Sequence, residues 1–384
     1  MTEHVSIPTR TETLWSNQLI SQSALWERLR IAIRENRFPH LSLISGRPGN
    51  GQLMLALSLA QSLLCTSAEK PCGYCDACHK VGRLIHPDLH FSFPLNNPKD
   101  TCQEHYPEWR EAIREKPFMS IGQWFGYLEG ESKNANISVA EIRNFIHLLG
   151  LTPYESRHTV MILWLPEYLG QDGNRLLKLF EEPPQNVFMI LATENSDMLL
   201  PTIHSRAQRF RMHSLLPEEA ADRLVRDQAC DRDLALSAVI AADGHFETAR
   251  HQLLQAEIPA VDFLKKLLQS CFTYHVIQIV EWVDAFVAMN KEEQKQFLLW
   301  LQLLLSFVIR YRAGGNTTPA NGQNAMLQYA VRLSASLRYP QIEAWNDLID
   351  ETLIATQRNA NARLLMTDFC IRLSHIVRET KLNN

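Results

Sequence analysis

The sequence predicts an α/β fold in which a doubly wound parallel sheet occupies residues 1–212 and an all-α part follows. Two nearly continuous apolar runs, residues 160–165 and 187–192, are typical of strands buried on both faces of a parallel sheet. Helical patterns and short loops separate these runs from further strand-like segments, which indicates alternating strands and helices. After residue 212 only helical patterns follow.

Length and charge limit the possible function classes. With 384 residues, the chain is long enough for two or three domains and a sizeable core. The net charge of -4 gives no general basic field, so contact with nucleic acid would need a local patch or a partner. The N-terminus shows no signal peptide, and the most apolar stretch, residues 297–309, is too short to span a bilayer. We expect a soluble, cytoplasmic protein without a membrane segment.

An amphipathic helix is predicted over residues 17–37, where Leu25, Leu29 and Ile33 recur at helical spacing and charged residues occupy the opposite face. The helix leads into an apolar strand at residues 41–44. This arrangement brings a strand directly before a glycine-rich turn.

The turn has the layout of a phosphate-binding loop. Gly46 and Gly51 keep the spacing of the pattern G-x-x-x-x-G-K-[ST], in which backbone N–H groups surround phosphates, the Lys binds their charge and the hydroxyl binds Mg²⁺. Gln52 stands in place of the Lys and Leu53 in place of the hydroxyl residue. Gln carries no positive charge and Leu cannot bind a metal. With a helix predicted over residues 54–64, the loop is either a chance match or a nucleotide-binding fold without its nucleotide chemistry.

Four of the eight cysteines cluster directly after this helix. Cys65, Cys72, Cys75 and Cys78 form the pattern C-x6-C-x2-C-x2-C, whereas the other four are isolated. Four thiolates within so short a span can close a tetrahedral site, and zinc is the leading interpretation. Because four protein ligands leave no open coordination position, we expect a structural site in a module at residues 65–78.

Two alternatives remain for the cysteine cluster. Iron–sulfur ligation uses similar short repeats, but here the fourth ligand lies upstream and no Cys-Pro follows at Cys78. His79 and His86 are nearby reserve ligands, although we expect them to be merely solvated.

A second nucleotide-binding element is also incomplete. An active ATPase would carry an Asp-Glu pair at the end of the strand at residues 160–165, to hold Mg²⁺ and polarise water. This chain continues with Pro166 and Glu167, so only one carboxylate is left. A short helix is predicted over residues 174–180, ending at a Glu-Glu-Pro-Pro sequence.

Residues 94–136 are predicted to form an insertion on the surface. They are rich in polar residues, Pro and Trp and show no sustained period, so the aromatic residues are interpreted as local packing. The helix that follows is expected to start at Ser138, with Glu141 in the position of a capping box.

Four features in this order resemble the clamp-loader branch of the AAA+ proteins. They are the cysteine cluster after the loop helix, the His-Pro-Asp sequence at residues 86–88, the string at residues 174–184 with Leu-Leu-Lys and Glu-Glu-Pro-Pro, and the segment at residues 201–206. The likeness covers residues 19–212 in sequence and the rest in architecture only. It implies an AAA+ RecA-like domain at 1–212, a helical lid domain at 213–254 and a helical collar domain at 255–384.

The resemblance also implies a function. Such subunits form a five-membered ring with ATP-hydrolysing motor subunits of the gamma/tau type and with a clamp-opening delta subunit. The ring opens a sliding clamp and loads it on primed DNA, so clamp and DNA would be partners through the complex. The family's Ser-Arg-Cys motif matches Ser205, Arg206 and Ala207, and its Arg reaches the ATP of the neighbouring subunit as an arginine finger.

We expect a non-catalytic subunit with no functional ATP site. Where motor subunits carry an Arg in the lid, this chain has Glu247, so three positions, with Gln52 and the Leu165-Pro166 pair, depart from an active ATPase. The alternatives are a gamma/tau-type motor with an atypical loop, or a zinc-dependent nucleic-acid-binding module. The three losses disfavour the motor, and the acidic balance without a basic helix beside the cysteines disfavours the module.

Overall fold

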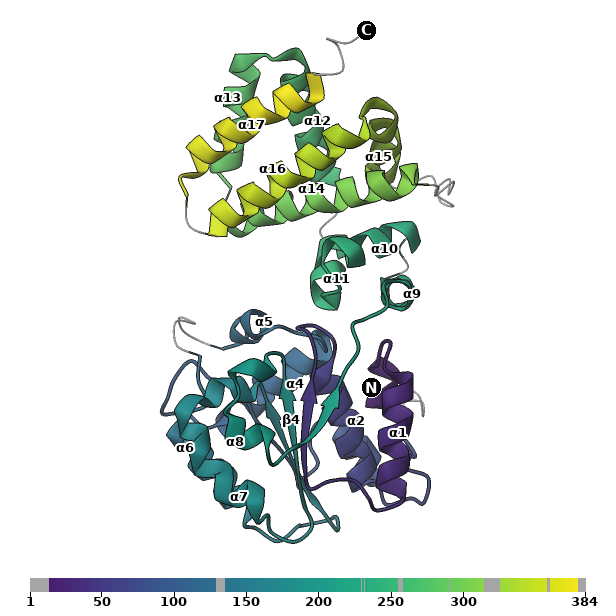
Figure 1. Ribbon diagram of the computed structural model, residues 1–384, viewed down its shortest axis with the longest axis vertical. Coiled ribbons are helices and arrows are strands. Elements are labelled where there is room, and N and C mark those ends of the chain that lie inside the picture. The colour runs from purple at the N-terminus through teal and green to yellow at the C-terminus, as the bar shows by residue number, and fades with distance from the viewer. Residues whose placement is uncertain are drawn as a thin grey trace, which may run out of the picture. The chain divides into compact units, whose positions relative to one another are not determined.

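A five-stranded parallel sheet lies at the centre of the first of two units, which span Met1–Leu216 and Pro217–Asn384 (Figure 1). The structure is a computed structural model that describes residues 14–128, 135–228, 230, 232–254, 258–289, 291–313, 325–357 and 360–378. The strands are β1 (Leu41–Ser45), β2 (Leu89–Ser92), β3 (Thr159–Trp164), β4 (Val187–Thr193) and β5 (Gln208–Arg211), in the spatial order β2-β3-β4-β1-β5. The predicted parallel sheet is confirmed.

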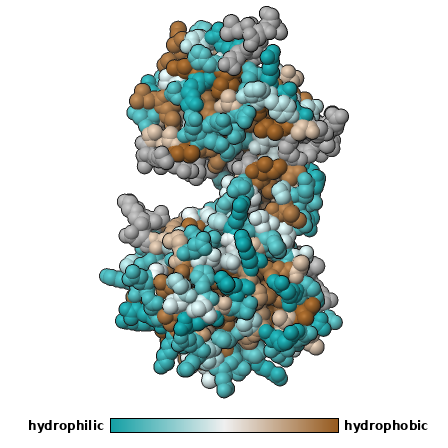
Figure 2. All heavy atoms as spheres, viewed as in Figure 1, coloured by the Kyte–Doolittle hydropathy of each residue, from teal (hydrophilic) through white to brown (hydrophobic). Residues whose placement is uncertain are grey.

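Helices cover both faces of this sheet, as Figure 1 shows. They are α1 (Ser23–Arg34), α2 (Gln52–Leu64), α3 (Asp76–Gly82), α4 (Tyr106–Glu115), α5 (Ile121–Phe125), α6 (Val139–Leu149), α7 (Leu177–Glu181) and α8 (Pro201–His204). Short 3₁₀ segments are η1 (Trp15–Gln18), η2 (Cys102–His105), η3 (Pro166–Leu176) and η4 (Ser196–Met198). Every residue of α2 is buried, which explains why its sequence is apolar on all sides. The face of the unit in Figure 2 is largely hydrophilic, as expected for helices whose apolar sides pack inward.

The predicted helix over residues 17–37 is wrong in its extent. The chain forms η1, turns at Ser21 with a φ of 58°, and begins α1 only at Ser23. Gln22 explains the break, because its side-chain amide donates to the backbone oxygen of His213 at 2.8 Å and so ties this turn to a distant loop. Within α1 the predicted apolar stripe is buried.

The insertion contains helices that its sequence pattern did not predict, α4 and α5, and residues 129–134 lie outside the described part. Its aromatic residues pack locally, as predicted, but they form a core. Trp109 stacks on Phe93 with ring centroids 4.1 Å apart, and Trp124 meets Trp109 edge-on at 5.0 Å. The indole N–H of Trp124 donates to the backbone oxygen of Pro94 at 2.8 Å. The insertion therefore packs at the carboxyl ends of β2 and β3.

The predicted capping box at the start of α6 is only half formed. The hydroxyl of Ser138 accepts from the backbone N–H of Glu141 at 3.2 Å, as expected of a cap. The Glu141 carboxylate does not close the box and accepts instead from the backbone N–H of Cys102 at 2.9 Å. Burial raises the pKa of this carboxyl group. Glu141 thus links α6 to the insertion.

All secondary-structure elements in the described part of the second unit are helices. Its helices are α9 (Pro217–Gln228), α10 (Arg232–Ala241), α11 (Phe246–Leu254), α12 (Ile258–Thr273), α13 (Val276–Val287), α14 (Lys291–Arg312), α15 (Ala325–Ser336), α16 (Tyr339–Gln357) and α17 (Ala362–Arg378). The apolar stretch at residues 297–309 lies inside α14, where Leu298, Leu301 and Leu305 are fully buried. Among the described residues no helix is long and apolar enough to cross a membrane. The division of this unit into a lid and a collar remains a prediction. Residues 313–324 are rich in Gly, Asn and Thr, which predicts a flexible loop, and residues 314–324 lie outside the described part of the chain.

Asp88 of the His-Pro-Asp sequence holds the loop before β3. Its carboxylate accepts from the backbone N–H groups of Tyr154 at 2.5 Å, Glu155 at 2.9 Å and Ser156 at 2.7 Å. Burial opposes ionisation, but these three donors outweigh it and lower the pKa of Asp88. His86 is buried, against the expectation of a solvated side chain, and its Nδ1 accepts from the backbone N–H of Asp88 at 3.1 Å.

We predict that Asp88→Asn lowers the free energy of unfolding by about 2 kcal/mol at pH 7, because an amide can accept from only part of this donor set. The lowered pKa means that the contribution of Asp88 is present above its unfolded-state pKa and is lost as the pH falls through the folded-state value. The deficit of the variant, measured by urea denaturation, should therefore shrink in acid. Asp172→Asn, which removes only an exposed ion pair with Arg175, is the control and should change stability little. A constant deficit from neutral to acid pH would contradict this role.

Candidate functional site

The glycine-rich loop lies where the sequence predicted it, between β1 and α2. Gly51 is the N-cap residue of α2 and has a φ of 86°, a left-handed conformation that glycine adopts without strain. A β-carbon at Gly51 would also come within 2.6 Å of the ring of Phe118. The second glycine of the pattern is therefore required by this fold, whether or not the loop binds phosphate.

Gln52 occupies the lysine position as a buried bridge. Its side-chain amide donates to the backbone oxygens of Arg47 at 2.9 Å and Thr193 at 3.3 Å, which joins the loop to the end of β4. Leu53, at the hydroxyl position, is 4% exposed and is part of the core. Gln52 therefore offers no positive charge to the loop, and Leu53 offers no metal ligand.

A carboxylate of the chain itself faces the loop. Glu194, which follows β4, accepts from the backbone N–H of Gly49 at 3.4 Å. Burial raises the pKa of Glu194 to about 7, and the neighbouring Glu167 carboxylate adds to the effect. Backbone N–H groups at and before the start of a helix attract anions. In this chain the acceptor beside the start of α2 is a carboxylate of the same unit, Glu194.

Glu167, the one carboxylate left at the end of β3, has a structural role. It accepts from the hydroxyl of Thr193 at 2.7 Å and from the backbone N–H groups of Glu194 at 3.0 Å and Asn195 at 3.1 Å. Both of its oxygens therefore hold the chain that leaves β4. Burial raises the pKa of Glu167, as it does for Glu194.

A polar cavity of about 870 Å³ opens beside the loop at the carboxyl ends of β1, β4 and β5. Its basic lining residues are Arg47, His204, Arg209, Arg211 and His213, and Glu194 and Asp197 are its acidic ones. Sequence reasoning missed this group. The available signal was the alternation of Arg209 and Arg211 along β5, which places both side chains on one face of an edge strand. Such a cavity suits a polar or anionic ligand.

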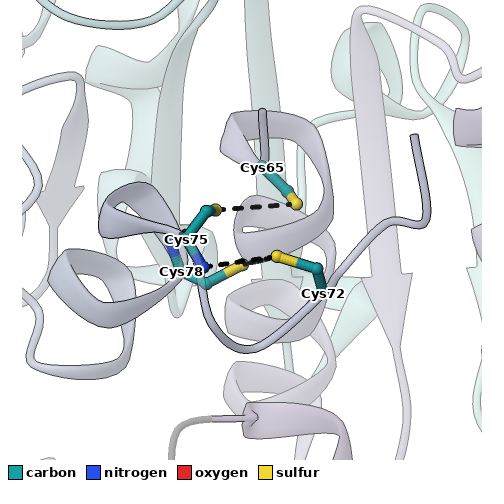
Figure 3. A group of neighbouring side chains, drawn as sticks. All are labelled: Cys65, Cys72, Cys75 and Cys78. Carbon is teal, nitrogen blue, oxygen red and sulfur yellow. Dashed lines mark hydrogen bonds between the residues drawn. The ribbon is translucent and has the colours of Figure 1, made fainter. Parts of the chain in front are cut away.

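The four clustered cysteines come together as predicted. Their sulfur atoms all lie within 4.8 Å of one another, and none of the four forms a disulfide. Figure 3 shows the four side chains converging, with Sγ–Sγ distances of 3.9 Å for Cys65–Cys75 and for Cys72–Cys78. A tetrahedral zinc site with bonds of 2.3 Å requires sulfur atoms about 3.8 Å apart, which these two pairs match closely, and the remaining pairs lie within 4.8 Å.

Two backbone N–H groups donate to sulfur atoms of this cluster. The N–H groups of Cys75 and Cys78 each point at the sulfur of the cysteine three residues earlier, at 3.4 Å in both cases. Hydrogen bonding with Cys78, opposed by burial, lowers the pKa of Cys65 to about 5, whereas the same bond together with burial raises the pKa of Cys78, so Cys65 is the member of this pair that ionises first. Thiolates are the form that binds metal ions. The reserve ligand His86 is instead bonded to Asp88, and the cluster consists of the four cysteines alone.

Arg206 lies just after α8, at the surface of the first unit. Its guanidinium forms an ion pair with Glu181 at the end of α7 and donates to the backbone oxygen of Thr202 at 2.9 Å. The side chain is 29% exposed. Ala207, where the resembling family has Cys, packs in the core beneath. Arg206 therefore lies at the surface, while the next residue, Ala207, is fixed in the core.

Glu247, the predicted third departure, lies in the first turn of α11. Its carboxylate accepts from the Nε of Arg250 at 2.7 Å and its side chain is 5% exposed. It is engaged within its own helix in the second unit.

The chain is similar to proteins of one family. A family model described as "DNA polymerase III, delta subunit" matches residues 21–215 of the 384. The DNA polymerase III subunit delta' of Escherichia coli K12 is 26% identical over 359 residues, which cover 91% of this chain and 93% of that protein. The delta' subunit of Bacillus subtilis 168 is 29% identical over 214 residues, 55% of this chain and 53% of that one. The gamma/tau subunit of Mycobacterium tuberculosis H37Rv is 26% identical over 212 residues, 54% of this chain and 30% of that one.

We predict that Glu194→Gln stabilises the protein at high pH. A carboxyl group whose folded-state pKa is raised to about 7 destabilises the folded state increasingly as the pH rises from its unfolded value toward 7. The amide cannot ionise yet still offers an acceptor to Gly49. The variant should gain about 1–3 kcal/mol relative to the wild type between pH 5 and pH 8, measured by thermal or urea unfolding.

Glu111→Gln removes an exposed carboxylate from α4 and serves as the control. Its free energy of unfolding relative to the wild type should be the same at pH 5 and at pH 8. A Glu194→Gln protein that is less stable than the wild type at pH 8 would show that the charged carboxylate stabilises the loop, contrary to this prediction.

Proposed function

The chain belongs to the DNA polymerase III delta-subunit family and is related to its delta' proteins, and on this premise we propose that it assists ATP hydrolysis by its partners without hydrolysing ATP. It acts as a non-catalytic subunit of the clamp loader and donates an arginine finger, Arg206, in trans. The proposal rests on one observation. The same unit has a loop that lacks the lysine and the hydroxyl of a nucleotide site, and an arginine, Arg206, held at its surface.

The loss of nucleotide chemistry rests on three contacts. Gln52 bridges two backbone oxygens of its own unit, Glu167 is occupied by the chain after β4, and Glu247 is paired with Arg250. A motor subunit needs a lysine for the phosphates, a hydroxyl and a carboxylate for Mg²⁺, and a basic sensor. All of these groups are absent or engaged elsewhere, which leaves no functional ATP site.

The ion pair with Glu181 prepares Arg206 for a role in trans. An exposed ion pair is worth only about 0–1 kcal/mol, so the guanidinium can exchange this carboxylate for the phosphates of a neighbouring ATP at little cost. Thr202 meanwhile keeps the side chain directed through a backbone oxygen. A guanidinium that is positioned in advance stabilises the charge that develops during phosphoryl transfer.

The partners follow from this role. They are gamma/tau-type motor subunits, whose ATP would receive Arg206, and the delta subunit. The sliding clamp and primed DNA are reached through the complex. The acidic net charge of -4 agrees with indirect contact to DNA.

The test of the finger is ATP hydrolysis by the matching motor and delta subunits with clamp and primed DNA. We expect wild-type protein to stimulate hydrolysis and Arg206→Ala to enter the complex without stimulating it, since an arginine finger is worth about 10³-fold or more at its site. Arg30→Ala, which removes an exposed ion pair with Glu27 on α1, is the matched control and should stimulate normally. Hydrolysis by this chain alone, or full stimulation by Arg206→Ala, would return the motor ATPase to first place.

We further propose that Cys65, Cys72, Cys75 and Cys78 hold a structural zinc ion. The sulfur spacing suits a tetrahedral ion, and with four protein ligands the ion would have no open position for catalysis. The module is tied to the sheet because Gln61 of α2 donates to the backbone oxygen of Cys78 at 3.0 Å. The ion would thus stabilise the region beside α2.

The purified protein should contain zinc, and Cys72→Ser should lose it together with about 2 kcal/mol or more of stability. Metal analysis and thermal unfolding check both effects. Cys230→Ser, outside the cluster, should retain metal and stability. Iron in place of zinc, or full metal retention by Cys72→Ser, would refute the assignment.

A further inference from the structure

One side chain of the insertion at residues 94–136, Phe118, contacts the glycine-rich loop at Gly51. Phe118 follows α4 in a turn closed by the backbone bond from Met119 to Lys116, at 3.0 Å, and its own side chain is 4% exposed. Three atoms of its ring lie 2.6–3.6 Å from the position that a β-carbon on Gly51 would occupy. An aromatic ring therefore rests directly on the residue that begins α2.

The insertion that carries Phe118 is packed against the sheet. Trp109 of α4 lies 5.2 Å from the ring of Trp164, which ends β3, and stacks on Phe93, which follows β2. The backbone N–H of Cys102 is bonded to the buried carboxylate of Glu141. In Figure 1, α5 lies beyond the arrowheads of the strands, at the carboxyl edge of the sheet. Ligands of doubly wound sheets bind at this edge.

The loop is also satisfied by other groups of the same unit. The side-chain amide of Asn50 donates to the backbone oxygen of His213 at 2.9 Å, and Gln52 donates to two further backbone oxygens. Glu194 accepts from Gly49. Polar partners and a ring thus come from three separate segments to a loop that in a phosphate-binding protein would face its ligand.

We propose that the insertion is an internal occupant of the phosphate-binding loop, and that Phe118 excludes a nucleoside triphosphate by covering the N-cap glycine of α2. The inference deepens the proposed function, on which it rests for the identity of the excluded ligand. It also gives the insertion at residues 94–136 a role.

Steric exclusion is a separate barrier from the missing charge. Gln52→Lys and Leu53→Thr restore the lysine and the hydroxyl, but they leave the ring on Gly51. A site rejects a ligand by an obstructing group as effectively as by a missing contact. Restoring the lysine and the hydroxyl alone should therefore not restore binding of a nucleoside triphosphate. Removing the Phe118 ring as well should restore it.

The experiment compares binding of a fluorescent ATP analogue with Mg²⁺ to the full-length chain. We expect no measurable binding by Gln52→Lys/Leu53→Thr, and an affinity at least about tenfold higher when Phe118→Ala is added. Phe125→Ala, a partly buried phenylalanine of α5, replaces Phe118→Ala in the control and should leave the loop variant unable to bind. Equal binding with and without Phe118 would overturn the proposal.

A second measurement decides the matter if the triple variant does not fold. Hydrogen exchange of the amides at residues 49–55 should be at least about tenfold faster in the single variant Phe118→Ala than in the wild type, and unchanged in Phe125→Ala. Unchanged exchange in Phe118→Ala would refute the role of the ring. Neither measurement involves Arg206 or a partner subunit, so failure of this inference and failure of the trans finger are recognised separately.

Discussion

Backbone N–H groups at the carboxyl edge of the parallel sheet need acceptors, and this requirement organises the first unit. The start of α2 and the loop after β4 present donors that buried structure cannot leave unpaired. In a nucleotide-binding protein the phosphates accept from such donors. Here Glu194 accepts from Gly49, and Glu167 accepts from the backbone of the loop after β4. The sheet therefore keeps its edge ordered through its own carboxylates.

Buried carboxylates also accept from backbone N–H groups away from this edge. Asp88 accepts from three consecutive backbone N–H groups before β3, and Glu141 accepts from Cys102 in the insertion. Each carboxylate joins two segments that are distant in sequence. Because a buried carboxylate that loses its donors is costly, each one specifies a single arrangement of its loop. The rigid scaffold around the sheet follows from these bonds as much as from its apolar core.

Packing around α2 connects the loop, the cysteine cluster and the N-terminal segment. The helix is buried along its whole length, and Gln61 within it accepts from the backbone N–H of Trp15 at 3.1 Å while donating to Cys78. Phe118 covers its N-cap at Gly51. A buried helix with polar partners at fixed points cannot shift without breaking them. The position of α2 therefore links the loop, the cysteine cluster and the N-terminal segment in one arrangement.

Local sequence patterns were enough to predict the parallel sheet, the strand–loop–helix context of Gly46 and Gly51, the cysteine cluster and the replacements at Gln52 and Leu53. These features follow from apolar runs, from spacing and from residue chemistry, all of which act over a few adjacent positions. The packing of whole elements set the partners of Glu194, the contact of Phe118 with Gly51, the start of α1 after Gln22 and the cavity with Arg209 and Arg211. Glu194 and Gly49 are 145 residues apart in the chain, and Gln22 and His213 are 191 apart. Such pairs depend on how whole elements pack, because no local pattern carries the position of a partner so far away.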